Sequence, residues 1–146
     1  MAALSLIHLA TEAEYKQLFV DTYCTSGPIY TWDNLPVVFY PDMFEHAFYK
    51  RATKNWKAPK SSIDLSRCER ILWIKEVLLD SSIIPRQGYD KAKNTHDSTR
   101  RVALLTPEDY VVVLRNDGNK WRFVTAYLID NAVTKSKILS APIWQK

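Results

Sequence analysis

Three β-rich runs, divided by turn signals, fill the C-terminal half of this chain and constrain its fold more than any other feature. They span residues 100–105, 109–116 and 120–129 and consist largely of β-branched and aromatic residues. The second divider, NDGN at residues 116–119, is a hairpin signal. We expect an antiparallel meander. Strict alternation in the third run predicts one face made of Trp121, Phe123, Thr125, Tyr127 and Ile129.

The N-terminal half predicts helices. Residues 11–23 and 64–80 each begin with the Ser/Thr-x-x-Glu spacing of a capping box, at Thr11 and at Ser66. Residues 85–100 are polar and predict a loop over a sheet edge. Helices that precede a sheet define an α+β fold, in which N-terminal helices pack on a small antiparallel β-sheet that ends in the meander.

The segment PDMFEHAFYKR, residues 41–51, follows a short predicted strand at 37–41. A helix here places one group of side chains on a buried stripe: Phe44, Ala47, Phe48 and Arg51. The neighbouring stripe then holds His46, Tyr49, Lys50 and Thr53. An imidazole one turn from an ammonium, on an apolar backing, fits a reaction site and equally fits a solvated helix face.

Length and composition are those of one soluble globular domain of 146 residues. No apolar run reaches the length of a membrane span, and the N-terminal MAALSLIHLA lacks the basic region and cleavage site of a signal peptide. We therefore expect this segment to belong to the fold and the protein to act in the cytoplasm. Cys24 and Cys68 are expected to be buried thiols and not a bridge or a nucleophile.

Charge is segregated along the chain. Residues 1–45 hold one cation and six acids, whereas residues 46–146 hold nineteen cations and ten acids. Five of the cations follow one another without an acid: Lys50, Arg51, Lys54, Lys57 and Lys60. This block is either a solvated surface or a phosphate-binding patch, and the sequence pI of about 9.0 favours the second. Trp56, inside the block, either stacks on a base or anchors the loop.

Metal and nucleotide chemistry fit this sequence poorly. His8, His46 and His96 have no His or Cys partner at ligand spacing, so we expect no metal and no cofactor. The sequence has no Gly-x-Ser-x-Gly elbow and no phosphate loop. An enzyme built from this chain would rely on metal-independent acid–base chemistry by His, Tyr, Lys and Arg.

These groups suffice to cleave RNA by attack of its own 2′-hydroxyl. One group takes the hydroxyl proton, another protonates the leaving 5′ oxygen, and cations stabilise the phosphorane-like transition state. A histidine titrates near neutral pH, and an arginine can hold a phosphate with two parallel hydrogen bonds. The candidate catalytic residues are His46, Thr125, Tyr127, Arg101 and Lys50. The candidate substrate-binding residues are Arg51, Lys54, Lys57, Lys60, Trp56 and Arg100.

Each candidate also has a structural explanation. His46 and Lys50 fit an exposed helix face, and Thr125 and Tyr127 are ordinary strand formers. The pair at 100–101 fits arginines that protect a sheet edge from pairing with other sheets. Taken singly, no residue decides between its two explanations.

Three segments taken in order resemble the phage-associated branch of the barnase–EndoU–colicin–RelE-type nucleases. These segments are FEHAF (44–48), DLSRCERILWI (64–74) and YVVVL…WRFVTAY (110–127). The resemblance implies a compact α+β domain with helices on a four-stranded antiparallel sheet. It also implies a metal-independent ribonuclease of toxin type, with functional positions at His46, Arg101, Thr125 and Tyr127.

The resemblance covers residues 36–130 of the single domain 1–146. It therefore separates a helical N-terminal extension (1–35) and a C-terminal tail (131–146) from a nuclease-like core. The partners that it implies are RNA, either tRNA or another cellular RNA, and a cognate immunity or antitoxin protein. It implies no membrane partner.

Two other functions remain open at this point. The chain could be a non-catalytic nucleic-acid-binding module that uses only its basic patch. It could also be a protein-interaction domain, for example an immunity or structural phage component, that uses its acidic N-terminal 45 residues. The sequence leaves the identity of the RNA and the oligomeric state open.

Overall fold

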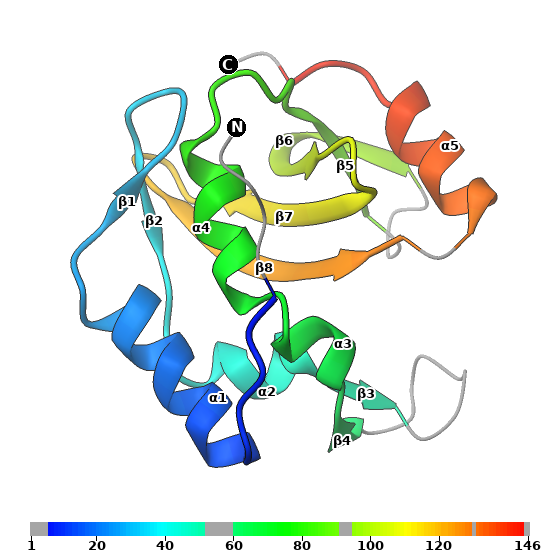
Figure 1. The fold of residues 1–146 in the computed structure, drawn as a ribbon. Helices are drawn as coiled ribbons and strands as arrows, with labels where there is room; N and C mark the ends of the chain where they lie inside the picture. The colour runs from blue at the N-terminus through cyan, green and yellow to red at the C-terminus, as the bar shows by residue number, and fades with distance from the viewer. Residues whose placement is uncertain (1–5, 52–59, 91–94, 130, 145–146) are drawn as a thin grey trace.

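The computed structural model describes residues 6–51, 60–90, 95–129 and 131–144 (Figure 1). For residues 50–51, 60–62, 89–90 and 95–101 it describes the backbone. The helices are α1 (Glu12–Phe19), continued by a π-helical turn η1 (Val20–Cys24), α2 (Met43–Phe48), α3 (Leu65–Cys68), α4 (Ile71–Leu79) and α5 (Ala132–Ser140). The strands are β1 (Ile29–Tyr30), β2 (Pro36–Val38), β3 (Tyr49–Arg51), β4 (Lys60–Ile63), β5 (Arg86–Asp90), β6 (Thr95–Leu105), β7 (Tyr110–Asn116) and β8 (Trp121–Leu128).

The fold is α+β, as the sequence predicts. Six strands form the main sheet in the order β1-β2-β8-β7-β6-β5, and β3 pairs with β4 in a separate ribbon. The predicted small, wholly antiparallel sheet is wrong, because β2 runs parallel to β8, with Val37 opposite Trp121. Residues 39–120 separate these two strands in sequence, so no local turn signal could predict that they pair.

The predicted meander is confirmed. Strand β7 pairs antiparallel with both β6 and β8. The β7–β8 turn uses Gly118 at φ 82°, a backbone conformation that glycine adopts without strain, and the N–H of Asp117 donates to the carbonyl of Lys120 at 2.9 Å. The β6–β7 turn places Asp109 at φ 63°.

A β-bulge reverses the alternation of β8. Thr125 lies opposite Val113 but Phe123 lies opposite Leu114, so Val124 is an extra residue in the strand. As a result Ala126 joins Trp121 and Phe123 in the core, and Thr125 lies outside it. The prediction that Thr125 and Tyr127 share a face with Trp121 and Phe123 is therefore wrong. We call the side with Trp121 and Phe123 the core face and the side with Thr125 and Tyr127 the outer face.

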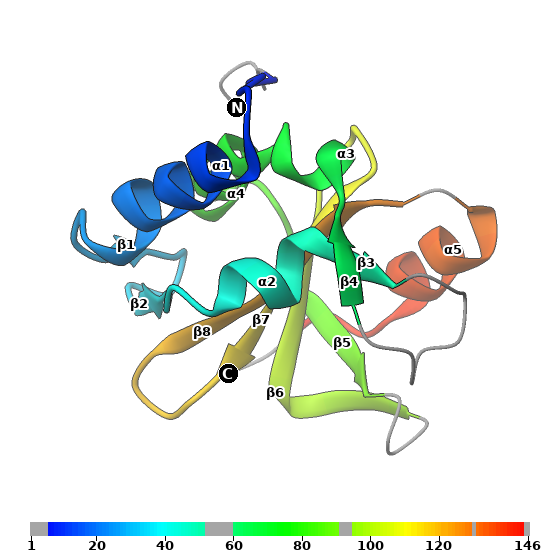
Figure 2. The same cartoon turned by 90° about the horizontal axis from the view of Figure 1, so that it is seen from below.

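Aromatic side chains from both halves of the chain fill the core. Helices α1 and α4 lie on one side of the sheet, and α2 packs against β8 (Figure 2). Phe19 of α1 is fully buried, and its ring centroid lies within 6.3 Å of the rings of Tyr23, Phe39, Phe44, Phe48 and Phe123. Residues on both sides of position 36 therefore share one core.

The tyrosine at the end of η1 inserts its hydroxyl beside the backbone of α4. Tyr23 Oη donates to the carbonyl of Ile71 at 2.5 Å and accepts from the N–H of Lys75 at 3.0 Å. Residues 71 and 75 are an i, i+4 pair, the groups that bond each other in an uninterrupted helix. Burial raises the pKa of this phenol well above its usual value.

The helix predicted over residues 41–51 is shorter than expected. It ends at Phe48, and Tyr49 adopts extended angles (φ −100°, ψ 152°) at the start of β3. Lys50 pairs with Ser62 of β4, and the Phe48 carbonyl accepts from the N–H of Asp64 at 2.7 Å. The prediction that Lys50 and His46 share a helical stripe is therefore wrong, because pairing with β4 overrides local helix propensity.

The predicted helix over residues 64–80 is two helices with a break at 69–70. Its cap is Asp64, whose carboxylate accepts from the N–H of Arg67 at 3.3 Å, and the predicted capping box at Ser66 does not form. The N-cap at Thr11 is confirmed, since Thr11 Oγ1 accepts from the N–H of Glu14 at 3.2 Å. The Glu14 carboxylate accepts from the Thr11 hydroxyl at 3.2 Å.

The loop predicted over residues 85–100 is wrong. Residues 86–90 form β5 and residues 95–100 belong to β6, paired antiparallel. Strand β5 is the last strand of the sheet, and edge strands carry polar residues that hide the alternation of a buried strand. None of the helices within the described ranges is long and apolar enough to cross a membrane.

Candidate functional site

Arg67 connects the three segments on which the nuclease resemblance rests. It belongs to the second segment, its Nη1 donates to the carbonyl of Ala47 in FEHAF at 2.9 Å, and its guanidinium lies 5.2 Å from the centroid of the Tyr127 ring in VTAY. A cation at this distance from an aromatic ring is electrostatically attracted to it. Ala47 follows His46 in the chain, so one guanidinium joins the neighbourhoods of two predicted catalytic residues.

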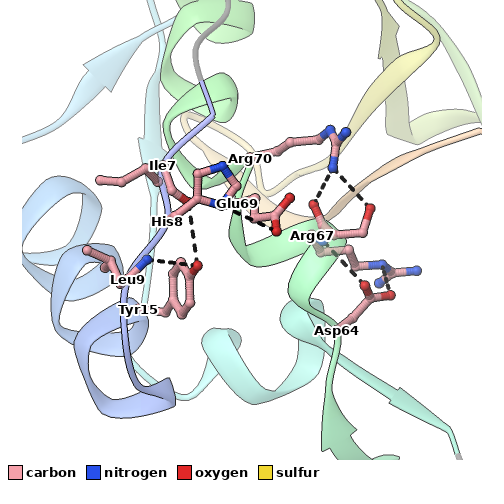
Figure 3. Close-up of polar contacts among 9 residues, drawn as sticks. Ile7, His8, Leu9, Tyr15, Asp64, Arg67, Glu69 and Arg70 are labelled. Atoms are coloured by element: carbon pink, nitrogen blue, oxygen red, sulfur yellow. Dashed lines mark hydrogen bonds and ion pairs between the residues drawn. The ribbon is translucent and has the colours of Figure 1, made fainter.

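Two features fix Arg67 in this position. Asp64 caps α3 and its Oδ2 lies 3.6 Å from Arg67 Nε, an ion pair in which the two side chains are 25% and 26% exposed (Figure 3). Strand β8 pairs with β2 only up to Arg122, and α2 and α3 contact β8. A residue of α3 can therefore reach Tyr127 around the edge of the sheet.

A second arginine marks the junction of α3 and α4. The Nη1 of Arg70 donates to the carbonyl and the Oγ of Ser66, at 2.7 and 3.0 Å, and its guanidinium lies 5.0 Å from the Trp73 ring centroid. The carbonyl of Arg70 accepts from the hydroxyl of buried Tyr110 at 3.4 Å. Arg70 is thus committed to the helix junction, whereas Arg67 faces β8.

The N-terminal segment crosses this junction (Figure 3). The N–H of Ile7 donates to the carbonyl of Glu69 at 2.9 Å, and His8 Nδ1 lies 3.5 Å from the Glu69 carboxylate. The Tyr15 hydroxyl accepts from the N–H of Leu9 at 3.0 Å. The segment is therefore tied to α1 and to the α3–α4 junction.

Thr125 and Tyr127 are half-buried on the outer face. The same face carries a row of arginines across three strands, because Arg101 of β6 lies opposite Arg115 of β7, which lies opposite Arg122 of β8. Arg115 is exposed, and the Arg122 side chain is 42% exposed. Tyr127 and the arginine row lie toward opposite ends of β8.

His46 is exposed on α2. At 3.6 residues per turn it lies roughly 150° around the helix from the centre of the buried stripe of Phe44, Ala47 and Phe48. The neighbouring Glu45 turns toward α1, where its Oε1 accepts from Lys16 Nζ at 2.6 Å. Solvent and any bound substrate can therefore reach the imidazole.

The basic candidates are placed only by their backbone. Lys50 and Arg51 lie on β3, Lys60 on β4, and Arg100 and Arg101 on β6. Arg101 takes its register position opposite Arg115. Three further predicted binding residues lie outside the described residues: Lys54, Trp56 and Lys57.

Two side chains near α1 and α2 have raised pKa values. A hydrogen bond to the Glu12 carboxylate, aided by burial, raises the pKa of the Tyr49 phenol to about 12. Burial raises the pKa of the Cys68 thiol to about 12. Cys24 and Cys68 are both free thiols; the prediction that they are buried holds for Cys68, whereas Cys24 is half-buried. A thiol with so high a pKa carries little nucleophilic thiolate at neutral pH.

Sequence reasoning missed three arginines of this site. Arg67 stands inside DLSRCERILWI, but no motif or spacing in the sequence singles it out. Arg115 and Arg122 pair across the hairpin, but a two-residue turn at Asp117 and Gly118 would place Lys120 opposite Arg115, so the NDGN signal does not predict this pair. Searches against protein-family models, curated proteins and solved structures found no match for the chain. Among the described residues no group of three or more His, Cys, Asp or Glu side chains could hold a metal ion.

Proposed function

We propose that the protein is a metal-independent ribonuclease that cleaves RNA by attack of the 2′-hydroxyl on the adjacent phosphorus. The observation that carries the proposal is the position of Arg67, which contacts the backbone next to His46 and the ring of Tyr127. A guanidinium therefore lies beside a phenol and beside the backbone of the helix that carries an exposed imidazole. These are the groups that phosphoryl transfer to an internal hydroxyl needs.

Arg67 supplies the positive charge. Its guanidinium is already oriented by Asp64 and by the Ala47 carbonyl. Little reorganisation is therefore needed when negative charge develops on the phosphate. A planar guanidinium can offer two parallel hydrogen bonds to phosphate oxygens. Thr125, two residues before Tyr127 on the same outer face, supplies a further hydroxyl to position the phosphate.

The reaction needs two proton transfers. The 2′ oxygen forms a bond to phosphorus while its proton moves to the imidazole of His46, and the bond from phosphorus to the 5′ oxygen breaks while that oxygen takes the proton of the Tyr127 hydroxyl. The products are a 2′,3′-cyclic phosphate and a free 5′-hydroxyl. Exchange of one proton each with water restores both side chains.

The test is cleavage of total bacterial RNA by the purified protein in EDTA. We expect discrete fragments that end in a 2′,3′-cyclic phosphate, and we expect His46→Ala and Tyr127→Phe to lower the rate by about two orders of magnitude, the typical contribution of a general acid or base. Urea unfolding of each variant must match the wild type, so that loss of activity is not loss of fold.

Three outcomes contradict the proposal. The first is RNA left intact by the wild-type protein. The second is cleavage of a DNA analogue, which has no 2′-hydroxyl to attack. The third is full activity in both the His46→Ala and the Tyr127→Phe variants.

A further inference from the structure

We propose that the outer face beside the β7–β8 hairpin binds single-stranded RNA, with Arg115 and Arg122 on phosphates and Tyr30 and Tyr40 against bases. This inference rests on RNA being the ligand of the proposed function, but not on the cleavage step. The surface consists of the outer-face residues at the end of the sheet formed by β1, β2 and the hairpin. We call it the hairpin surface.

The arginine row carries the first argument. Like charges directly opposite each other on neighbouring strands destabilise a sheet, and here three arginines, Arg101, Arg115 and Arg122, take consecutive register positions. Of the row's described side chains, that of Arg122 contacts an acid, since Asp117 Oδ2 lies 3.2 Å from Arg122 Nη2. A fold that keeps this unfavourable row offers a ready site for anions whose spacing matches neighbouring strands.

Exposed aromatic rings carry the second argument. Ile29 and Val37 point into the core, so the alternation of β1 and β2 puts Tyr30 and Val38 on the outer face. Tyr30 is 50% exposed, and Tyr40, just beyond β2, is 41% exposed. A large ring that stays exposed while the core is rich in buried aromatics is a natural platform for a base.

One contact ties the rings to the arginines. The guanidinium of Arg122 lies 5.7 Å from the Tyr40 ring centroid, and Val38 lies opposite Arg122 in the parallel β2–β8 pair. A ring and a guanidinium that hold each other in place form a preorganised pair for a nucleotide, the ring for its base and the cation for its phosphate.

The opposite end of the outer face, where Tyr127 lies, is partly covered. Helix α5 lies at the end of the sheet away from β1 (Figure 1), and Lys135 Nζ lies 2.8 Å from Asp109 Oδ1 in the β6–β7 turn. Val111 and Ala103 on that part of the face are buried. Tyr127 follows Arg122 by five positions along β8, about 16 Å, so a strand bound at the hairpin surface could lead to the proposed site of cleavage.

The chemistry favours unpaired RNA. Stacking on an exposed tyrosine requires a base that is free of its own helix, and stacking of this kind tolerates any base. A duplex would present its phosphates to the arginines but no base to Tyr30 or Tyr40. The hairpin surface should therefore separate single strands from duplexes.

The test is fluorescence anisotropy with a labelled 2′-O-methyl RNA 12-mer in EDTA. The methyl group blocks attack by the 2′ oxygen, so binding is measured without cleavage and this test can succeed where the cleavage proposal fails. We expect Arg115→Gln to weaken binding and to lower the log–log salt slope by about 0.7, the value for one phosphate contact on a single strand. We expect Tyr30→Ala to weaken binding about tenfold.

Lys75→Gln is the matched control, because it removes one charge from an exposed residue of α4, on the other side of the sheet. It should leave the affinity and the salt slope unchanged. Equal losses in Arg115→Gln and Lys75→Gln would overturn the proposal, because binding would then follow net charge alone. A duplex of the same sequence bound as tightly as the single strand would also overturn it, as would wild-type affinity in Tyr30→Ala.

Discussion

The guanidinium of Arg67 lies over the ring of Tyr127, 5.2 Å from its centroid, and joins a short helix to the last strand of the meander. The two residues are 60 positions apart in the chain, and each comes from one of the segments on which the resemblance to nucleases rests. Asp64 holds the other side of the guanidinium. The contact therefore depends on the helix cap and on the strand at the same time.

Replacement of Arg67 by lysine tests the geometry of this contact. Lysine keeps the charge but lacks the planar fork that covers the ring and binds phosphate oxygens in pairs. Under the proposed function we expect RNA cleavage to fall about a hundredfold, with a loss of about 1 kcal/mol in unfolding free energy. Rates on a defined oligonucleotide and urea unfolding measure the two effects.

Arg70→Lys makes the same chemical change three residues away, beyond the end of α3, where the guanidinium lies over Trp73 and not over Tyr127. It should keep wild-type cleavage. A rate for Arg67→Lys that equals the rate for Arg70→Lys would show that the position of the guanidinium over Tyr127 has no part in catalysis.

Replacement of Tyr23 by phenylalanine tests the hydroxyl that lies beside α4. The hydroxyl accepts from the N–H of Lys75 and donates to the carbonyl of Ile71, and the phenol is 4% exposed. We expect Tyr23→Phe to lower the unfolding free energy by about 1–2 kcal/mol, because two backbone groups lose a buried partner. Urea unfolding followed by tryptophan fluorescence measures the change.

Tyr30→Phe is the comparison for this experiment. Tyr30 is 50% exposed, so its hydroxyl can form hydrogen bonds with water in the folded and the unfolded state alike. It should change the unfolding free energy by less than about 0.5 kcal/mol. A stable Tyr23→Phe variant would mean that residues 71 and 75 simply pair with each other once the hydroxyl is gone.

Local signals predicted the parts of this fold that close over few residues. The hairpin at Gly118 and the cap at Thr11 each depend on neighbours within four positions, and both form as expected. The helix over 41–51 failed for the opposite reason. The residues of its expected last turn form strand β3 instead. They pair with β4, which begins only after residues 52–59.

The sequence named candidate site residues but did not show how they lie relative to the core. Thr125 and Tyr127 lie on one face together, but the bulge at Val124 puts that face opposite the core residues Trp121 and Phe123. A bulge adds one residue without changing the hydrophobic composition of the strand, so periodicity alone does not reveal it. The role of Arg67 could not be predicted from the sequence, because it depends on a contact between α3 and a strand residue 60 positions later.

Replacement of Asp33 by alanine tests a second long-range contact. The indole Nε1 of buried Trp121 donates to both carboxylate oxygens of Asp33, at 3.1 Å each, and Thr31 Oγ1 also donates to this carboxylate. The Trp121 ring lies against Trp32 and Trp144. We expect Asp33→Ala to cost about 2–3 kcal/mol, because a buried N–H loses a charged acceptor.

Asp33→Asn keeps an oxygen acceptor of the same shape. It should therefore lower the unfolding free energy less than Asp33→Ala does. Equal stability of Asp33→Asn and Asp33→Ala would show that the charge of the carboxylate, and not an acceptor oxygen alone, is what Trp121 needs. Unfolding followed by tryptophan emission suits this test, since the emission maximum of the Trp121 cluster should shift when water reaches the indole. No loss of stability in Asp33→Ala would contradict the assigned contact.

Alkaline pH should destabilise the protein in part through Tyr49. A hydrogen bond to the Glu12 carboxylate raises the pKa of this phenol to about 12 in the folded state, from the ordinary value of 10.0. The folded protein therefore keeps a proton that the unfolded chain has lost, so the stabilisation is complete below pH 10 and disappears as the pH rises from 10 to about 12. Tyr49→Phe removes this hydrogen bond, and urea midpoints at pH 8, 10 and 11.5 should show lower stability at pH 8 but a smaller decline above pH 10.

Tyr40→Phe removes an exposed hydroxyl and should follow the wild-type curve. A Tyr49→Phe curve parallel to that of the wild type would place the alkaline loss of stability in other groups, such as Tyr23.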